Sequence, residues 1–356
     1  MNSDFNTNKA SVLLESLVNQ LNWFLDIKSE VLSFEGEHRP REFARHLSCV
    51  YQMAGVDRPH KDISVIPKPL EIDENYWKHD PDYLRQLNTI QLYIKGELSQ
   101  YVDLFLLHGS MADGNYRRGW SDVDTFVVVS ASTMNDPDSL VDMRARCHEI
   151  REMIDKMAPL QHHGLMVVTD ASLLDYPSTY LPTEVLMESL DMIGNAKEFN
   201  IHKRPFNSDA LLRDLYNREN LAIESIKTGY FKHHSRNGKY LEIPFRNRRD
   251  NMYQLHYFLG YTMTLPALVL SGIGMPTRKS ESFDKARCLF SSCAWELVEK
   301  ATEIRNEWQE REYPGYTGNT IPDWVCETLR DDYMERFIAL IRESIIALDN
   351  KKAYEA

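Results

Sequence analysis

Residues 104–129 read LFLLHGSMADGNYRRGWSDVDTFVVV, and this stretch decides the fold of the chain. An apolar run ends in Gly109-Ser110, and a second apolar run follows Asp122-Val123-Asp124. Alternate residues of a strand share one face, so the two aspartates should point the same way while Val123 points into the core. Two carboxylates fixed side by side on a strand make a site for a divalent cation such as Mg²⁺, which prefers oxygen ligands.

The Gly-Ser pair suits the binding of a phosphate group. Gly109 lets the backbone approach a ligand closely because it has no Cβ. Ser110 offers a hydroxyl and an N–H to a phosphate oxygen, and a helix that began there would add a partial positive charge. A turn or a solvated strand edge would explain either motif alone. Eleven residues apart and between two apolar strands, the motifs together indicate a joint phosphate and metal site.

These motifs resemble the signature of the DNA polymerase β-like nucleotidyltransferase superfamily: an apolar strand, Gly-Ser or Gly-Gly, a gap of about ten residues, then Asp-x-Asp or Asp-x-Glu. The resemblance implies transfer of an NMP, expected to be AMP, from an NTP co-substrate to a hydroxyl of a small molecule, a protein or an RNA end, with release of pyrophosphate. It implies that Asp122 and Asp124 are catalytic and hold Mg²⁺ or Mn²⁺. It also implies that Gly109, Ser110 and Ser121 bind the nucleotide and its phosphates.

The superfamily usually supplies a third carboxylate from a following strand, and this chain departs from that pattern. Where an acidic residue is expected, the sequence has Gln161-His162-His163. One interpretation gives His163 the third catalytic role, either as a metal ligand or as the base for the acceptor hydroxyl, since neutral imidazole suits both. In the others, the enzyme works with two carboxylates, or both histidines are ordinary strand-edge residues.

Basic side chains should also meet the triphosphate. Candidates are Arg117 and Arg118 in the loop between the two motifs, the arginines within residues 246–249, and Lys279. In relatives with a helical second domain, a lysine of that domain commonly reaches the phosphates. Lys279 is the candidate for this phosphate-binding role, because it follows a glycine-rich turn at a predicted helix start. The alternative for each of these basic residues taken alone is a solvated surface position.

Composition limits the partners. The 356 residues include 53 acidic and 41 basic side chains, for a net charge of −12. Extended nucleic-acid binding and membrane-surface binding are not expected, because both partners are anionic. The longest apolar stretch, residues 258–270, is too short to span a bilayer. Five cysteines without a C-x-x-C pair predict a reducing, cytoplasmic setting rather than a disulfide framework.

Hydrophobic periodicity predicts an α+β fold, in which a small mixed β-sheet core with flanking helices precedes an all-α C-terminal helical bundle. The predicted domains are an N-terminal helical extension at 1–80, the nucleotidyltransferase core at 81–180 and the C-terminal helical domain at 181–356. Residues 1–100 resemble no known family and could serve as a lid, an oligomer contact or a partner dock.

Core strands are predicted at 103–108, 123–130 and 162–169, and no strand signal is found after residue 180. Helices are predicted at 9–34, 40–54, 80–100, 137–157, 183–192, 208–229, 249–272, 281–309 and 321–349.

A sheet core followed by helices is similar to small-molecule and antibiotic-modifying members of the superfamily, such as the aminoglycoside and lincosamide nucleotidyltransferases. Two other function classes remain open. The first is a non-catalytic, nucleotide-binding regulatory or partner-binding module that keeps the fold, which the missing third carboxylate favours. The second is a phosphohydrolase that uses the same carboxylates without an acceptor.

Overall fold

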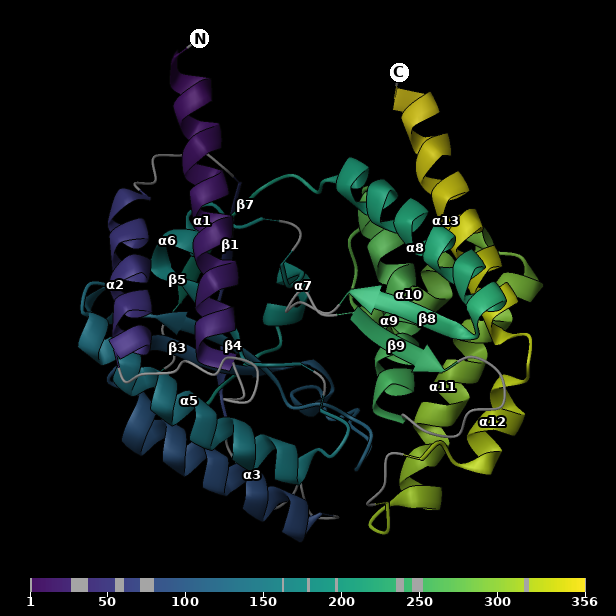
Figure 1. Cartoon of the computed structure of the whole chain (residues 1–356), viewed down its shortest axis with the longest axis horizontal. Coiled ribbons are helices and arrows are strands. Elements are labelled where there is room, and N and C mark those ends of the chain that lie inside the picture. Colours follow the sequence, from purple (N-terminus) through teal and green to yellow (C-terminus); the bar gives the residue numbers. More distant parts are fainter. Residues whose placement is uncertain are drawn as a thin grey trace. The chain divides into compact units, whose positions relative to one another are not determined.

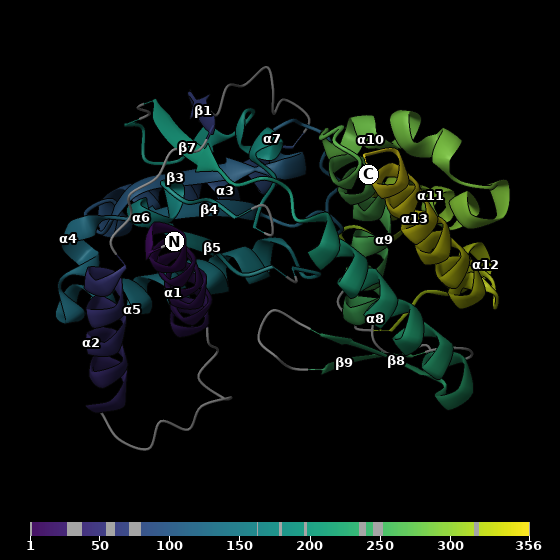
Figure 2. The same cartoon turned by 90° about the horizontal axis from the view of Figure 1, so that it is seen from above.

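The computed structural model describes residues 2–26, 38–54, 61–70, 80–161, 163–177, 180–195, 198–234, 240–244, 252–316 and 320–355. The chain divides into two compact units. Unit 1 comprises Met1–Tyr116 and Ser121–Pro205, and unit 2 comprises Arg117–Trp120 and Phe206–Ala356. Figures 1 and 2 show the elements of both units from two directions.

A five-stranded mixed sheet forms the centre of unit 1. Its strand order is β2-β6-β3-β4-β5. Strand β3 pairs antiparallel with β4 and β6, whereas β4 with β5 and β2 with β6 are parallel. The predicted α+β class with a small mixed sheet is therefore confirmed. The strands are β2 (Lys68–Pro69), β3 (Val102–His108), β4 (Asp124–Val129), β5 (Met166–Thr169) and β6 (Leu190–Asp191).

Helices cover one face of this sheet. Phe105, Leu107 and Val127 of the sheet share an apolar cluster with the buried sides of these helices. Helix α5 begins at Pro137 because the Asp136 side chain caps its first N–H groups, and its range is the predicted one. The helices are α1 (Asn2–Asp26), α2 (His38–Met53), α3 (Pro81–Tyr93), the π-helix η1 (Ile94–Leu98), α4 (Ala131–Met134) and α5 (Pro137–Met157).

A two-stranded ribbon and short helices cover the opposite face. Leu104, Phe126 and Val128 of the sheet share a second apolar cluster with residues of the ribbon. Because both faces of β3 and β4 are buried, their sequences are continuous apolar runs rather than alternating ones. The covering elements are β1 (Lys61–Val65) paired antiparallel with β7 (Phe199–Lys203), α6 (Asp170–Leu173) and α7 (Thr183–Leu186).

The prediction that strands end before residue 180 is wrong. The helix predicted at 183–192 is the single turn α7, and it is followed by β6, whose Leu190 pairs with Leu107 of β3. A short apolar run is compatible with either helix or strand, and here the neighbouring edge of the sheet decides. The strand predicted at 162–169 begins only at Met166.

Helices form most of unit 2. Helix α9 packs against α8, α10, α11 and α13, which confirms the central place that its apolar sequence predicts. The unit also contains a hairpin of β8 (Tyr230–His234) and β9 (Tyr240–Pro244), so it is not entirely helical. The helices are α8 (Ser208–Thr228), α9 (Met252–Gly272), α10 (Lys279–Ala286), the 3-10 turn η3 (Arg287–Leu289), α11 (Ser292–Glu312), α12 (Asp323–Leu329) and α13 (Tyr333–Glu355).

Two long helices predicted in this unit are each divided in two. Between α10 and α11, Ser291 caps a new helix through the N–H of Ala294. Between α12 and α13, Arg330 has a φ of 63°, which ends the helix. Among the described residues, no helix combines the length and the apolar character that a membrane crossing needs.

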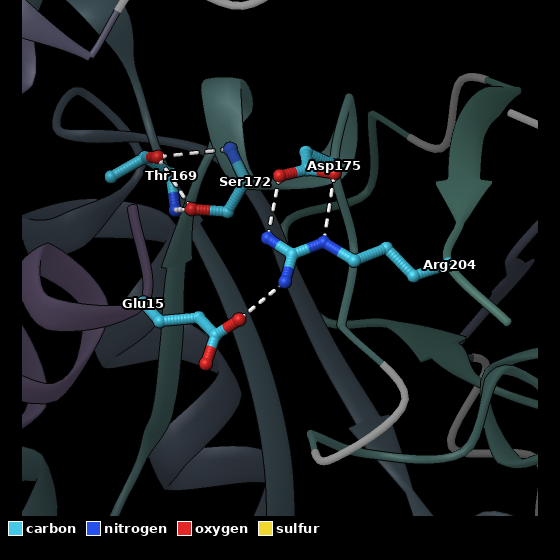
Figure 3. A network of polar contacts seen from close by, with 5 residues as sticks. All are labelled: Glu15, Thr169, Ser172, Asp175 and Arg204. Atoms are coloured by element: carbon cyan, nitrogen blue, oxygen red, sulfur yellow. Dashed lines mark hydrogen bonds and ion pairs between the residues drawn. The ribbon is translucent and has the colours of Figure 1, made fainter. Parts of the chain in front are cut away.

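Arg204 joins three segments near the end of unit 1 (Figure 3). Its Nε donates to Asp175 at 2.8 Å, a second nitrogen contacts the other Asp175 oxygen, and a third contacts Glu15 of α1. Thr169 and Ser172 cap α6 beside this group. Asp175 is only 1% exposed, so Arg204 supplies the counter-charge for a buried carboxylate.

We expect Arg204→Met to lower the free energy of unfolding by about 3–5 kcal/mol, because it leaves the buried Asp175 carboxylate without its positively charged partner. Arg41→Met is the matched control, since Arg41 and Asp138 form an ion pair whose side chains are 55% and 60% exposed. Loss of this exposed ion pair should lower the free energy of unfolding by less than about 1 kcal/mol. Urea unfolding followed by circular dichroism measures both, and equal losses would contradict the assigned role of Arg204.

Candidate metal and nucleotide site

The two aspartates lie at the start of β4. The strand begins at Asp124, and Asp122 and Val123 immediately precede it. Val123 is 1% exposed and belongs to the apolar cluster beneath the helices. The carboxylates of Asp122 and Asp124 lie together, as the alternation of side chains predicts, although Asp122 is not itself part of the strand.

His163 completes a cluster of three candidate ligands. Its Nε2 lies 3.9 Å from an Asp122 carboxylate oxygen, and one ligand atom from each of Asp122, Asp124 and His163 lies within 4.8 Å of the others. The pairing of strands explains why these residues lie close together. Strand β5 runs parallel to β4 with Met166 opposite Phe126, so the segments that precede the two strands lie at the same end of the sheet. The Asp122 side chain is 8% exposed and that of His163 is 38% exposed.

The Gly-Ser bend lies directly against Asp124. In the β3–β4 ladder, His108 is opposite Asp124, so the next residue, Gly109, turns beside that carboxylate. Gly109 has a φ of 70°, and a Cβ placed on it would lie 2.5 Å from an Asp124 oxygen. Any side chain at this position would therefore be strained and would also displace the carboxylate.

The remaining nucleotide candidates of unit 1 flank this bend. Ser110 lies in a one-turn 3-10 helix, η2 (Gly109–Met111). This turn is too short to provide the helix dipole considered from the sequence, so a phosphate role for Ser110 rests on its hydroxyl and N–H. Ser121, which precedes Asp122, is 5% exposed.

Sequence reasoning missed the part played by Gln161. Its Oε1 accepts from the N–H of Val123 at 2.7 Å, and its Nε2 donates to the carbonyl of His163 at 2.8 Å. The side chain is buried, with the residue 4% exposed. The only signal in the sequence is that Gln161 lies where the superfamily usually has its third carboxylate.

Sequence reasoning also missed Trp120. Residues 117–120 of the loop between the two motifs belong to unit 2. There the Trp120 ring, 3% exposed, lies 4.6 Å from the His256 ring and 5.3 Å from the Trp308 ring. The guanidinium of Arg118 lies 5.5 Å from the Tyr313 ring centroid.

Lys279 is the first residue of α10, so the predicted helix start is confirmed. Lys279 belongs to unit 2, whereas the two aspartates belong to unit 1, and its contact with phosphate stays a prediction. His162 and the arginines within residues 246–249 lie outside the described residues.

The donor set fits a divalent cation. Within the part of the chain that the structure describes, Asp122, Asp124 and His163 form the only group of three acidic, cysteine or histidine residues close enough to share an ion. Two carboxylates and an imidazole suit several divalent metals. Gly109 leaves room for the Asp124 carboxylate that a side chain would otherwise fill.

Comparison with known proteins agrees with this arrangement. No curated protein matches the chain. Residues 93–163 match the family model described as a nucleotidyltransferase domain, a segment that includes both motifs and ends at His163. The chain therefore carries a nucleotidyltransferase domain, consistent with the DNA polymerase β-like superfamily that its Gly-Ser and Asp-Val-Asp motifs indicate.

Proposed function

We propose that this protein transfers an NMP, with AMP as the expected group, from an NTP to a hydroxyl of a small molecule, a protein or an RNA end. The observation that carries the proposal is the position of the Gly109 bend against Asp124, beside Asp122 and His163. This position brings the Gly-Ser turn and a candidate cation site together in the segment that matches the nucleotidyltransferase domain.

In the proposed reaction, the acceptor oxygen attacks the α-phosphorus and forms a new P–O bond. The bond from the α-phosphorus to the oxygen that bridges to the β-phosphorus breaks, and pyrophosphate leaves with its electron pair. The acceptor hydroxyl loses its proton to a base or to water. Asp122 and Asp124 would hold Mg²⁺ or Mn²⁺, and such an ion supplies neutralisation of charge on the attacking and leaving oxygens.

The nucleotide would be positioned by groups on both sides of the aspartates. Ser110 and Ser121 would offer their hydroxyls to phosphate oxygens, while the absence of a side chain on Gly109 would allow a close approach. Lys279 at the first turn of α10 is the proposed cationic contact for the triphosphate. Positioning of the substrates and neutralisation of their charge would account for most of the rate enhancement.

The proposed setting is a reducing cytoplasm, which is supported by five free cysteines. Membranes and extended nucleic acids are not proposed as partners, since the net charge of −12 would oppose both. A homo-oligomer is compatible with the proposed activity.

The deciding experiment incubates the full chain with each of the four α-³²P-labelled NTPs, Mg²⁺ or Mn²⁺, and a cell extract. Label in protein, RNA or a small-molecule fraction, with release of pyrophosphate, is the expected result and identifies the acceptor class. Nucleotide binding without any turnover would instead support a regulatory or partner-binding module. Release of monophosphate without a labelled acceptor would indicate a phosphohydrolase, and either outcome would overturn the proposal.

Asp122→Asn and Asp124→Asn should each lower nucleotide transfer by at least about a hundredfold, because each removes a negative ligand from the proposed cation site. Asp113→Asn is the control, since Asp113 is an exposed carboxylate of the same loop that accepts only a local N–H from Asn115 among its described contacts. Labelled pyrophosphate release from a γ-³²P NTP measures the rates. Activity near that of wild type in either site variant would remove these carboxylates from the mechanism.

Gly109→Ala should lower transfer by about a hundredfold, because its Cβ would push the Asp124 carboxylate out of place. Gly229→Ala separates this effect from backbone strain. Gly229 has a similar φ of 79°, but nothing lies within 4 Å of its added Cβ. Both variants should lose about 1 kcal/mol of stability, while only Gly109→Ala should lose activity. Equal activities of the two variants would contradict the assigned contact.

Lys279→Gln should raise the KM for NTP several-fold with a smaller change in kcat, because it removes a charge that contacts phosphate in both ground and transition states. Lys285→Gln is the control, since it removes a lysine of the same helix that pairs with Glu281 at 2.8 Å. Initial rates over a range of NTP concentrations distinguish them, and an unchanged KM for Lys279→Gln would eliminate this phosphate contact.

A further inference from the structure

The backbone of His163 is held by two side chains. Its carbonyl accepts from Gln161 Nε2 at 2.8 Å and also from an Nη of Arg151 on α5. The Arg151 side chain is 13% exposed and is itself fixed by Asp155, whose carboxylate lies 2.9 Å from its Nε. An ordinary strand-edge residue does not need such anchoring, so these contacts indicate that the position of His163 matters.

The same amide group connects His163 to the two aspartates. Besides bonding to the His163 carbonyl, Gln161 accepts from the N–H of Val123 at 2.7 Å, and its Nε2 lies 3.4 Å from the Val123 carbonyl. Val123 is the middle residue of Asp122-Val123-Asp124. One buried side chain therefore ties the backbone that carries the His163 imidazole to the backbone between the two carboxylates.

The spacing of the three side chains suits a shared ion. Their candidate ligand atoms lie within 4.8 Å of one another. Ligands about 2.1 Å from one ion lie at most about 4.2 Å apart, so small side-chain rotations would close the site. If Nε2 of His163 binds the ion, its lone pair is no longer available to accept the proton of an acceptor hydroxyl.

We propose that His163 is the third protein ligand of the cation, and that it shifts the preference of the site from Mg²⁺ toward Mn²⁺. This inference rests on the proposed function only for the use of the ion. Mg²⁺ favours an all-oxygen shell and is reluctant to lose water. Mn²⁺ also suits carboxylate and water ligands, but as a first-row transition metal of the Irving–Williams series it accepts a nitrogen donor more readily than Mg²⁺ does. Gln161 is a positioning residue that acts through His163 and Val123.

The first test uses Mn²⁺ alone with the full chain and no nucleotide. Electron spin-echo envelope modulation of bound Mn²⁺ should show coupling to a ¹⁴N nucleus in wild type and none in His163→Asp or His163→Ala. His46→Ala, which removes an exposed histidine on α2, should leave the coupling intact. A wild-type spectrum without nitrogen coupling would overturn the proposal.

The second test compares affinities for Mg²⁺ and Mn²⁺ by calorimetry. His163→Asp converts the donor set to three carboxylates and should lower the preference for Mn²⁺ over Mg²⁺ by about tenfold. Circular dichroism identifies any variant that fails to fold, and the wild-type spectrum still decides the question in that case. An unchanged preference in folded His163→Asp would contradict the selectivity assigned to His163.

Gln161→Met tests positioning. It should weaken Mn²⁺ binding by about tenfold, as loss of a group that orients a ligand does. Gln91→Met is matched to it, because Gln91 is equally buried at 4% exposed and its amide also donates to a backbone carbonyl, that of Leu70 at 3.3 Å. Both should destabilise the fold, but only Gln161→Met should affect Mn²⁺. Equal Mn²⁺ affinities in the two folded variants would reduce Gln161 to a structural residue.

These measurements separate failure of this inference from failure of the proposed function. Nitrogen coupling without nucleotide transfer would leave His163 as a ligand in a protein with another activity. Transfer of label without nitrogen coupling would support the proposed nucleotidyl transfer but would show that His163 is not a ligand of the ion.

Discussion

The antiparallel pairing of β3 with β4 is the constraint on which the site depends. It places His108 opposite Asp124, and the chain must therefore turn at Gly109 within contact distance of that carboxylate. Burial of both faces of these strands holds the pairing in place, because a slip of one residue would turn every side chain to the opposite face and exchange the residues that fill one cluster with those that fill the other. The same apolar packing that stabilises unit 1 thus fixes the separation of the bend and the aspartates.

Local sequence patterns were enough to predict part of the fold and of the candidate site. Alternation around Val123 was enough to predict that Asp122 and Asp124 share a side, since a strand offers only two faces. Apolar residues at three- and four-residue intervals from Leu140 to Ile154 were enough to place α5. Short elements could not be predicted in this way. Strand β6 has only two residues, too few to show a hydrophobic period, and it is defined by its pairing with β3.

Contacts between distant side chains could not be predicted. Gln161 reaches the backbone of Val123 across 38 residues of sequence, and Asn22 of α1 reaches the backbone of Val167 across 145 residues. Arg204 joins Glu15 to Asp175 in the same way (Figure 3). Gln161, Asn22 and Arg204 belong to neither the Gly-Ser nor the Asp-Val-Asp motif, and the partner of each is defined only once the elements have folded together. His163 is intermediate, because the resemblance places an acidic residue near its position, but only the structure brings its Nε2 within 3.9 Å of an Asp122 carboxylate oxygen.

Assignment of residues 117–120 to unit 2 limits how the protein can be divided. Trp120 is buried among the rings of His256 and Trp308, yet it stands two residues before Asp122. A fragment that ended at Pro205 would leave this indole in water and remove the support of the chain that enters the aspartate pair. A chimaera that exchanged the helical unit for that of another protein would have to replace Trp120 and its flanking residues along with it. Neither unit is therefore one continuous segment of the chain.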